Sequence, residues 1–166
     1  MTSDKTPWNP SRTATARVKN ALPAPTTCPY CSSDVRIAHH DEIYGRAYGQ
    51  WPWAYLCEAC DAYVGMHPFT NIPLGSLANA DLRLARKEAK LPFEKLWRPY
   101  TQYRSKEYAS LAKHLGIPVE HCHFGWFDVE TCRKAEEWAL AQLDLRQGEK
   151  VVPRRGKPGS QRKLRW

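Results

Sequence analysis

Cys28-Pro29-Tyr30-Cys31 and Cys57-Glu58-Ala59-Cys60 are two cysteine pairs with the same internal spacing, and 25 residues separate them. Two thiolates three positions apart in a tight turn point the same way, so each pair supplies half of a tetrahedral metal site. Zn²⁺ accepts four sulfur ligands and needs no open coordination position when its role is structural. The alternative, two disulfides or four separate core thiols, is disfavoured by the repeated spacing. We therefore predict one structural Zn²⁺ held by Cys28, Cys31, Cys57 and Cys60.

The length and apolar content of the chain limit the classes of protein to which it can belong. Its 166 residues suffice for one ordinary domain or two small ones. The chain has no apolar run as long as the roughly 18 residues that a membrane span needs. Met1–Asn20 lacks the apolar core of a secretory signal. We therefore expect a soluble cytoplasmic protein, in a compartment where paired cysteines bind metal more often than they form disulfides.

The net charge of +8 is concentrated at the two ends of the chain. Residues 148–166 carry seven Lys and Arg side chains against one Glu, and residues 1–27 carry four against one Asp. Charged segments without an apolar period do not bury a core, and clustered positive charge attracts phosphate. We predict a disordered arm over residues 1–26 and a basic disordered tail over residues 148–166.

The segment 27–75 has the pattern of a zinc ribbon. Val35 and Ile37 alternate with polar neighbours, Tyr55-Leu56 leads into the second cysteine pair, and Ala62-Tyr63-Val64 leaves it. This pattern predicts three short strands. The core of such a module is minimal, so the metal supplies much of its stability, on the order of 10 kcal/mol.

Residues 76–147 have a helical pattern instead. Leu77–Lys90 is rich in helix formers, and Pro92 either kinks this helix or begins a second short one. Ser105–Gly116 and Asp128–Leu145 predict two more helices, the first ended by its glycine. The predicted fold class is α+β: a small N-terminal zinc ribbon followed by a three- to four-helix segment, between disordered basic arms.

The stretch 28–143 resembles a family of zinc-finger-containing proteins encoded mainly by phages and prophages. Besides the cysteine pairs, the resemblance rests on Glu42–Arg46, Asp61–Gly65, His67-Pro68, Pro73–Gly75, Leu77–Arg83, Leu115–Ile117, Cys122-His123, Gly125 and Phe127-Asp128. Met66 stands where this resemblance leads us to expect a cysteine. The resemblance implies a structural zinc and a small phage accessory protein in the host cytoplasm, and it brings no activity with it.

Two features favour nucleic acid, DNA or RNA, as a partner. Tyr44–Tyr55 holds five aromatic residues, one Arg and two glycines, and exposed rings beside a cation stack on unpaired bases. Arg46 and Tyr48 are the candidate contacts, unless the rings instead close over the ribbon core. In the tail, the candidate phosphate contacts are Arg154, Arg155, Lys157, Arg162, Lys163 and Arg165.

The near-neutral middle of the chain fits a second function equally well, a protein-interaction module acting on a host or phage enzyme such as the transcription machinery. Lys106–Val119 resembles the first half of a helix-turn-helix, but Gly125 interrupts the recognition helix, so we favour a plain helical hairpin. We expect no membrane partner and no small-molecule substrate.

A second metal site and a catalytic site are both disfavoured. His121, Cys122, His123 and Cys132 are ligand types for another zinc, but adjacent residues seldom ligate one ion. His39-His40 fits a metal-dependent nuclease, yet no further ligands can be assembled around it. The sequence has neither a Gly-rich phosphate loop nor a nucleophile elbow. We therefore expect no catalytic residues, and we rank a nuclease last.

Overall fold

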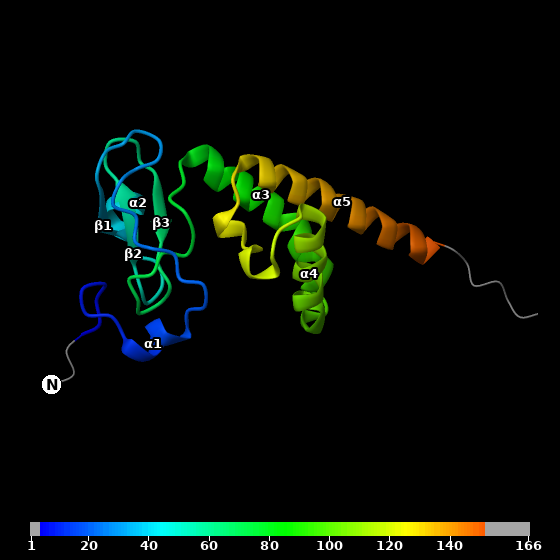
Figure 1. Cartoon of the computed structure of the whole chain (residues 1–166), viewed down its shortest axis with the longest axis horizontal. Coiled ribbons are helices and arrows are strands. Elements are labelled where there is room, and N and C mark those ends of the chain that lie inside the picture. The colour runs from blue at the N-terminus through cyan, green and yellow to red at the C-terminus, as the bar shows by residue number, and fades with distance from the viewer. Residues whose placement is uncertain (1–3, 152–166) are drawn as a thin grey trace, which may run out of the picture.

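A computed structural model describes residues 4–151, apart from the side chains of 149–151. A small antiparallel sheet lies at one end of the molecule and a group of helices at the other (Figure 1). The elements are α1 (Arg12–Arg17), β1 (Val35–His39), α2 (His40–Tyr44), β2 (Trp53–Cys57), β3 (Tyr63–Gly65), α3 (Ala80–Trp97), α4 (Arg104–Leu115) and α5 (Val129–Val151). This arrangement confirms the predicted α+β class. No described helix is long and apolar enough to cross a lipid bilayer.

The sheet brings the two cysteine pairs to the same end of the ribbon. Its strands are ordered β1-β2-β3, and both pairings are antiparallel. Val35, which begins β1, lies opposite Cys57, which ends β2. Because the first cysteine pair lies just before β1, this register places it beside the second pair.

Part of the aromatic segment closes over the ribbon core. Trp51 and Tyr55 are buried, with Trp51 Nε1 donating to the Thr70 carbonyl at 3.0 Å and the Tyr55 hydroxyl donating to the Asn71 carbonyl at 2.6 Å. Buried rings that also satisfy their polar atoms stabilise a core without an unpaired donor. Tyr44 and Tyr48 remain exposed. The segment is therefore divided: Trp51 and Tyr55 close over the ribbon core, and the rings of Tyr44 and Tyr48 stay on the surface.

Helix α3 is continuous through Pro92. Asn79 caps its first turn, where the side-chain oxygen accepts from the Leu82 N–H at 3.0 Å. Pro92 is buried, beside Phe93 in the helical core. The structure thus decides between the two alternatives for this proline: it lies inside one helix and does not begin another.

Helices α4 and α5 are joined by two short 3₁₀ turns, Val119–His121 and Phe124–Trp126. Gly116 ends α4 in a left-handed conformation with φ of 68°, as predicted. No recognition helix follows α4 directly in the described chain, so the connection is the plain hairpin that the sequence favoured. α5 then packs along α3 (Figure 1).

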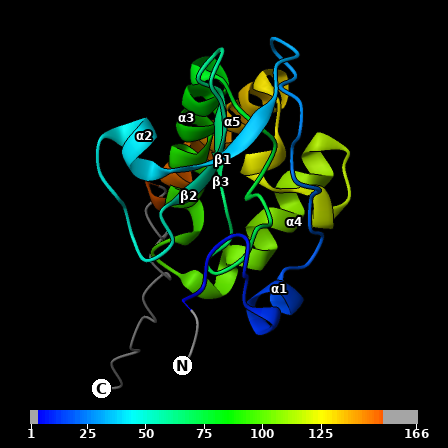
Figure 2. The ribbon, with the colours of Figure 1, turned by 90° about the vertical axis from the view of Figure 1, so that its left-hand side faces the viewer.

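Residues 4–26, predicted to be disordered, are instead placed against the body and include α1. The Trp8 ring lies edge-on to Trp53 at 5.3 Å, and the Ser11 N–H donates to the Phe69 carbonyl at 2.8 Å. Trp8 is a single aromatic residue in a polar segment, so the sequence has no periodic apolar pattern there that would predict an ordered arm. Figure 2 shows α1 and α2 well apart around the sheet.

The last helix also differs from its prediction. α5 continues through Gly148 to Val151, past the predicted end near Leu145 and into the predicted tail. One glycine costs a helix only about 1 kcal/mol, so it does not oblige the helix to end. The rest of the predicted tail, residues 152–166, lies outside the described residues.

Two glycines meet where the ribbon joins the helices. The Ser76 N–H donates to the Gly125 carbonyl at 3.0 Å, and a Cβ added to Gly75 would lie 2.0 Å from that same oxygen. Arg86 of α3 braces the contact, donating to the Phe127 carbonyl at 2.9 Å and to the Ser76 carbonyl and hydroxyl at 3.0 and 2.6 Å. Close backbone approach here requires both glycines.

Candidate metal centre

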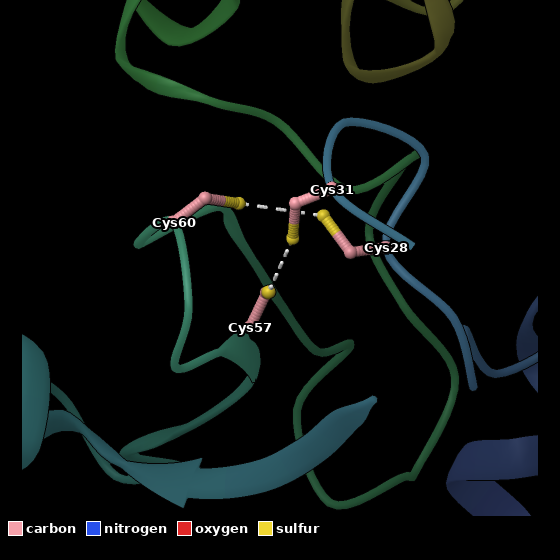
Figure 3. Close-up of side chains that lie close together, drawn as sticks. All are labelled: Cys28, Cys31, Cys57 and Cys60. Carbon is pink, nitrogen blue, oxygen red and sulfur yellow. Dashed lines mark hydrogen bonds between the residues drawn. The ribbon is translucent and has the colours of Figure 1, made fainter. Parts of the chain in front are cut away.

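The four cysteine sulfurs converge on one point, as Figure 3 shows. All four Sγ atoms lie within 4.8 Å of one another, with Cys28 to Cys60 and Cys31 to Cys57 both at 3.4 Å. Tetrahedral Zn²⁺ with bonds of about 2.3 Å separates its sulfurs by about 3.8 Å. A disulfide would need about 2.05 Å, and all four residues are free thiols. The geometry could therefore bind one zinc ion, as predicted.

The two cysteine turns have the same backbone construction. In the first, the Ser32 N–H donates to the Cys28 carbonyl at 2.9 Å, and in the second the Asp61 N–H donates to the Cys57 carbonyl at 3.0 Å. Ser32 and Asp61 both adopt left-handed conformations, with φ of 61° and 55°. Each turn is thus closed around its own cysteine pair, which holds both sulfurs on the same side.

Backbone and hydroxyl donors surround the sulfurs. The Ser33 hydroxyl and then the Ser33 N–H lower the pKa of Cys31 to about 6. Burial raises the pKa of Cys57, while the N–H groups of Ala59 and Cys60 oppose that shift. Zinc binds thiolate, and donors of this kind disperse its negative charge. The donor set therefore fits a structural zinc.

A profile of the zinc-finger-containing domain family matches residues 24–142. The chain belongs to this family. The match covers both cysteine turns, the sheet and most of the helical part, and it agrees with the sulfur cluster that the fold assembles. Searches among curated proteins and among solved structures found no significant match. Family and geometry together establish a zinc-binding protein.

The histidine and cysteine residues considered for a second zinc do not gather in this zinc-finger protein. Cys122 and Cys132 are buried in the helical core, and burial raises the pKa of each to about 11. His121 and His123 are exposed and pack on Trp126, with ring centroids 5.9 and 4.8 Å away. Over residues 4–148, the four ribbon cysteines are the only group of three or more metal-ligating side chains.

His39 and His40 have local structural roles. The His39 side chain caps α2 by accepting from the Asp41 N–H at 3.4 Å, and its Nδ1 lies 3.0 Å from Asp41 Oδ2. His40 packs on Tyr44, with ring centroids 5.4 Å apart. Neither belongs to a cluster of metal ligands within the described residues.

Two exposed tyrosines, Tyr44 and Tyr48, form a continuous row with the partly buried Tyr63 on the ribbon surface. Tyr44 contacts Tyr48 at 5.3 Å and Tyr63 at 5.6 Å between ring centroids. Arg46 lies over Tyr48 at 4.6 Å, and Arg83 lies over Tyr63 at 3.9 Å. We call Tyr48, Tyr44 and Tyr63 the tyrosine row; an arginine stands at each end of it.

The sequence alone predicts only part of this surface. Arg46 and Tyr48 were predicted from their place among clustered aromatics, and the structure puts them together. Tyr63 and Arg83 were missed because one lies in a strand and the other in a helix, with no local spacing to connect them. The tail candidates Arg154, Arg155, Lys157, Arg162, Lys163 and Arg165 lie outside the described residues.

Proposed function

We propose that this protein is a phage or prophage accessory protein that binds nucleic acid through the ribbon surface and the basic tail. The observation that carries the proposal is the tyrosine row with an arginine at each end. Tyr44 and Tyr48 are 42% and 46% exposed, although the nearby Trp51 and Tyr55 are buried. Rings left in water beside guanidinium groups are the surface that unpaired bases stack on.

The parts of this surface have separate tasks. Stacking on a ring contributes about 1–3 kcal/mol per base and tolerates any base. The tail residues Arg154 to Arg165 supply charge for phosphates, which gives affinity that falls as salt rises. Zinc has a structural task, because it fixes the ribbon from which the rings project. No catalytic step is part of the proposal.

Fluorescence anisotropy with labelled single- and double-stranded DNA and RNA tests the proposal. We expect single strands to bind more tightly, and Tyr48→Ala to weaken that binding about 5- to 150-fold, by the loss of one stacked base. Tyr100→Ala is the matched control, because Tyr100 is also exposed but lies on the α3–α4 connection, outside the tyrosine row. If no complex forms even at low salt, the proposal is wrong.

One observation favours the second candidate, a protein-interaction module acting on a host enzyme such as the transcription machinery. Leu84 and Leu91, two turns apart on α3, are 54% and 53% exposed. Leucines at this spacing share one helix face and suit a protein partner. A pull-down from host lysate treated with nuclease separates the candidates: a partner that survives the nuclease supports the interaction module, and one that disappears supports nucleic acid.

A further inference from the structure

A pocket opens at the Tyr63 end of the tyrosine row. Its volume is about 350 Å³, and Glu42, Tyr44, Asp61, Tyr63 and Arg83 are among the residues that line it. Pockets for small ligands start at about 300 Å³, so this one has room for a single planar group and little more. Its walls combine aromatic rings, one guanidinium and two carboxylates.

The Arg83 guanidinium is held in a fixed orientation. It lies 3.9 Å from the centre of the Tyr63 ring, and Nη1 donates to the carbonyls of Ala78 at 2.6 Å and Asp61 at 3.3 Å. A guanidinium fixed by two carbonyls and a ring loses little freedom when a ligand arrives. Arg83 therefore adds a fixed guanidinium at the end of the tyrosine row, and a guanidinium is a group on which a base can stack.

The two carboxylates of the pocket differ in whether their oxygen atoms are free to accept hydrogen bonds from a ligand. Glu42 is engaged, because Oε2 accepts from Arg36 at 2.6 Å and Oε1 accepts from the His39 N–H at 2.9 Å. The Asp61 carboxylate has no hydrogen-bond or ion-pair partner within the described part of the chain. Its backbone is fixed by the second cysteine turn, through the N–H bond to the Cys57 carbonyl.

We propose that this pocket binds one unpaired guanine base. A carboxylate presents two acceptor oxygens side by side, and guanine alone among the common bases presents two adjacent donors, N1–H and the N2 amino group. The base stacks against Arg83 while Asp61 accepts both donors. This inference rests on the proposed function, which brings single-stranded nucleic acid to the neighbouring tyrosine row.

The test uses the full chain and single-stranded oligothymidylate probes carrying one central dG, dA or deoxyinosine. Inosine keeps N1–H but lacks the amino group, so it reports on the second hydrogen bond. We expect the dG probe to bind about tenfold more tightly than the dA probe, with inosine in between. Asp61→Asn should abolish this preference and leave binding to plain oligothymidylate in place. Asparagine tolerates the left-handed backbone of Asp61, so the turn is kept.

Asp144→Asn makes the same change of charge on the exposed surface of α5 and should retain the guanine preference. The guanine preference is the ratio of the affinities of one variant for the dG and dA probes. Removing a negative charge raises both affinities alike, so that effect cancels in the ratio. Equal binding of all three probes by the unmodified protein, or a preference that persists in Asp61→Asn, overturns the guanine pocket and leaves the proposed function standing. Failure to bind any single strand at low salt overturns both.

Discussion

Glu107 is a buried carboxylate whose charge is met by one arginine. Its Oε1 accepts from Arg146 Nη2 at 2.8 Å, and Nη1 of the same arginine donates to the Leu96 carbonyl at 3.0 Å. One side chain of α5 thus holds the start of α4 and the end of α3 together. Removing one partner of such a pair leaves the other buried and uncompensated.

We predict that Arg146→Ala lowers the free energy of unfolding by about 1–3 kcal/mol, less than for a fully buried pair because Arg146 is partly exposed. The control is Arg133→Ala, which removes an exposed ion pair with Glu137 on the same helix and should cost only about 0.3–0.5 kcal/mol. Urea unfolding measures both variants. If the two variants lose the same free energy of unfolding, the buried charge of Glu107 does not need Arg146 as its partner.

The buried thiols of Cys122 and Cys132 predict a pH-dependent reactivity. Burial raises the pKa of each to about 11, so at pH 8 only about one thiol in a thousand is ionised. With zinc chelated, iodoacetamide should modify the four ribbon cysteines quickly and these two slowly, and the slow phase should accelerate as the pH approaches 11. Mass spectrometry resolves the sites. Rapid modification of Cys132 at pH 8 would contradict its place in the core.

At the scale of elements, the junction between Gly75 and Gly125 controls how the ribbon meets the helices. Gly75→Ala would force a Cβ against the Gly125 backbone, so we predict a loss of about 1–3 kcal/mol in unfolding free energy. Gly148→Ala is the counterpart, because no atom lies within 4 Å of its added Cβ, and alanine should stabilise α5 by about 0.5–1 kcal/mol. The midpoint temperature of thermal unfolding should fall for Gly75→Ala and rise for Gly148→Ala. Destabilisation by both substitutions would contradict this prediction.

Elements with local signals were predictable from the sequence. The cysteine spacing alone indicated the metal site, since each turn is closed within a few residues of its own pair. The start of the last helix at Asp128 was predictable too, and the Oδ1 atom of Asp128 accepts from the Thr131 N–H at 2.7 Å. The contact of Trp8 with Trp53 and the stacking of Arg83 on Tyr63 join distant segments, so they follow from tertiary packing and leave no pattern in the chain.

At the scale of the whole molecule, two cores of different kinds lie side by side. The helical core contains large buried side chains such as Phe93 and Leu111. The ribbon core is built around the cysteines, with Trp51, Tyr55 and Val64 packed beside them. A core this small depends on its metal, whereas the helices have apolar burial of their own.

This difference predicts the effect of chelation. Removing zinc should unfold the ribbon and shift the total tryptophan fluorescence, to which the buried Trp51 contributes, toward that of solvent-exposed rings, while most of the helical signal in far-ultraviolet circular dichroism remains. Both probes can be followed in one titration with a chelator. Simultaneous loss of the two signals would mean that the helices cannot stay folded without the ribbon.

The most direct test of the account is the zinc content of the purified protein, measured by elemental analysis together with that of Cys57→Ser. Cys57 is fully buried and supplies one of the four sulfurs of the cluster, so we predict one zinc per chain in the unmodified protein and a large loss of zinc in the variant. A protein that carries no metal and keeps its ribbon structure under strong chelation would contradict the account.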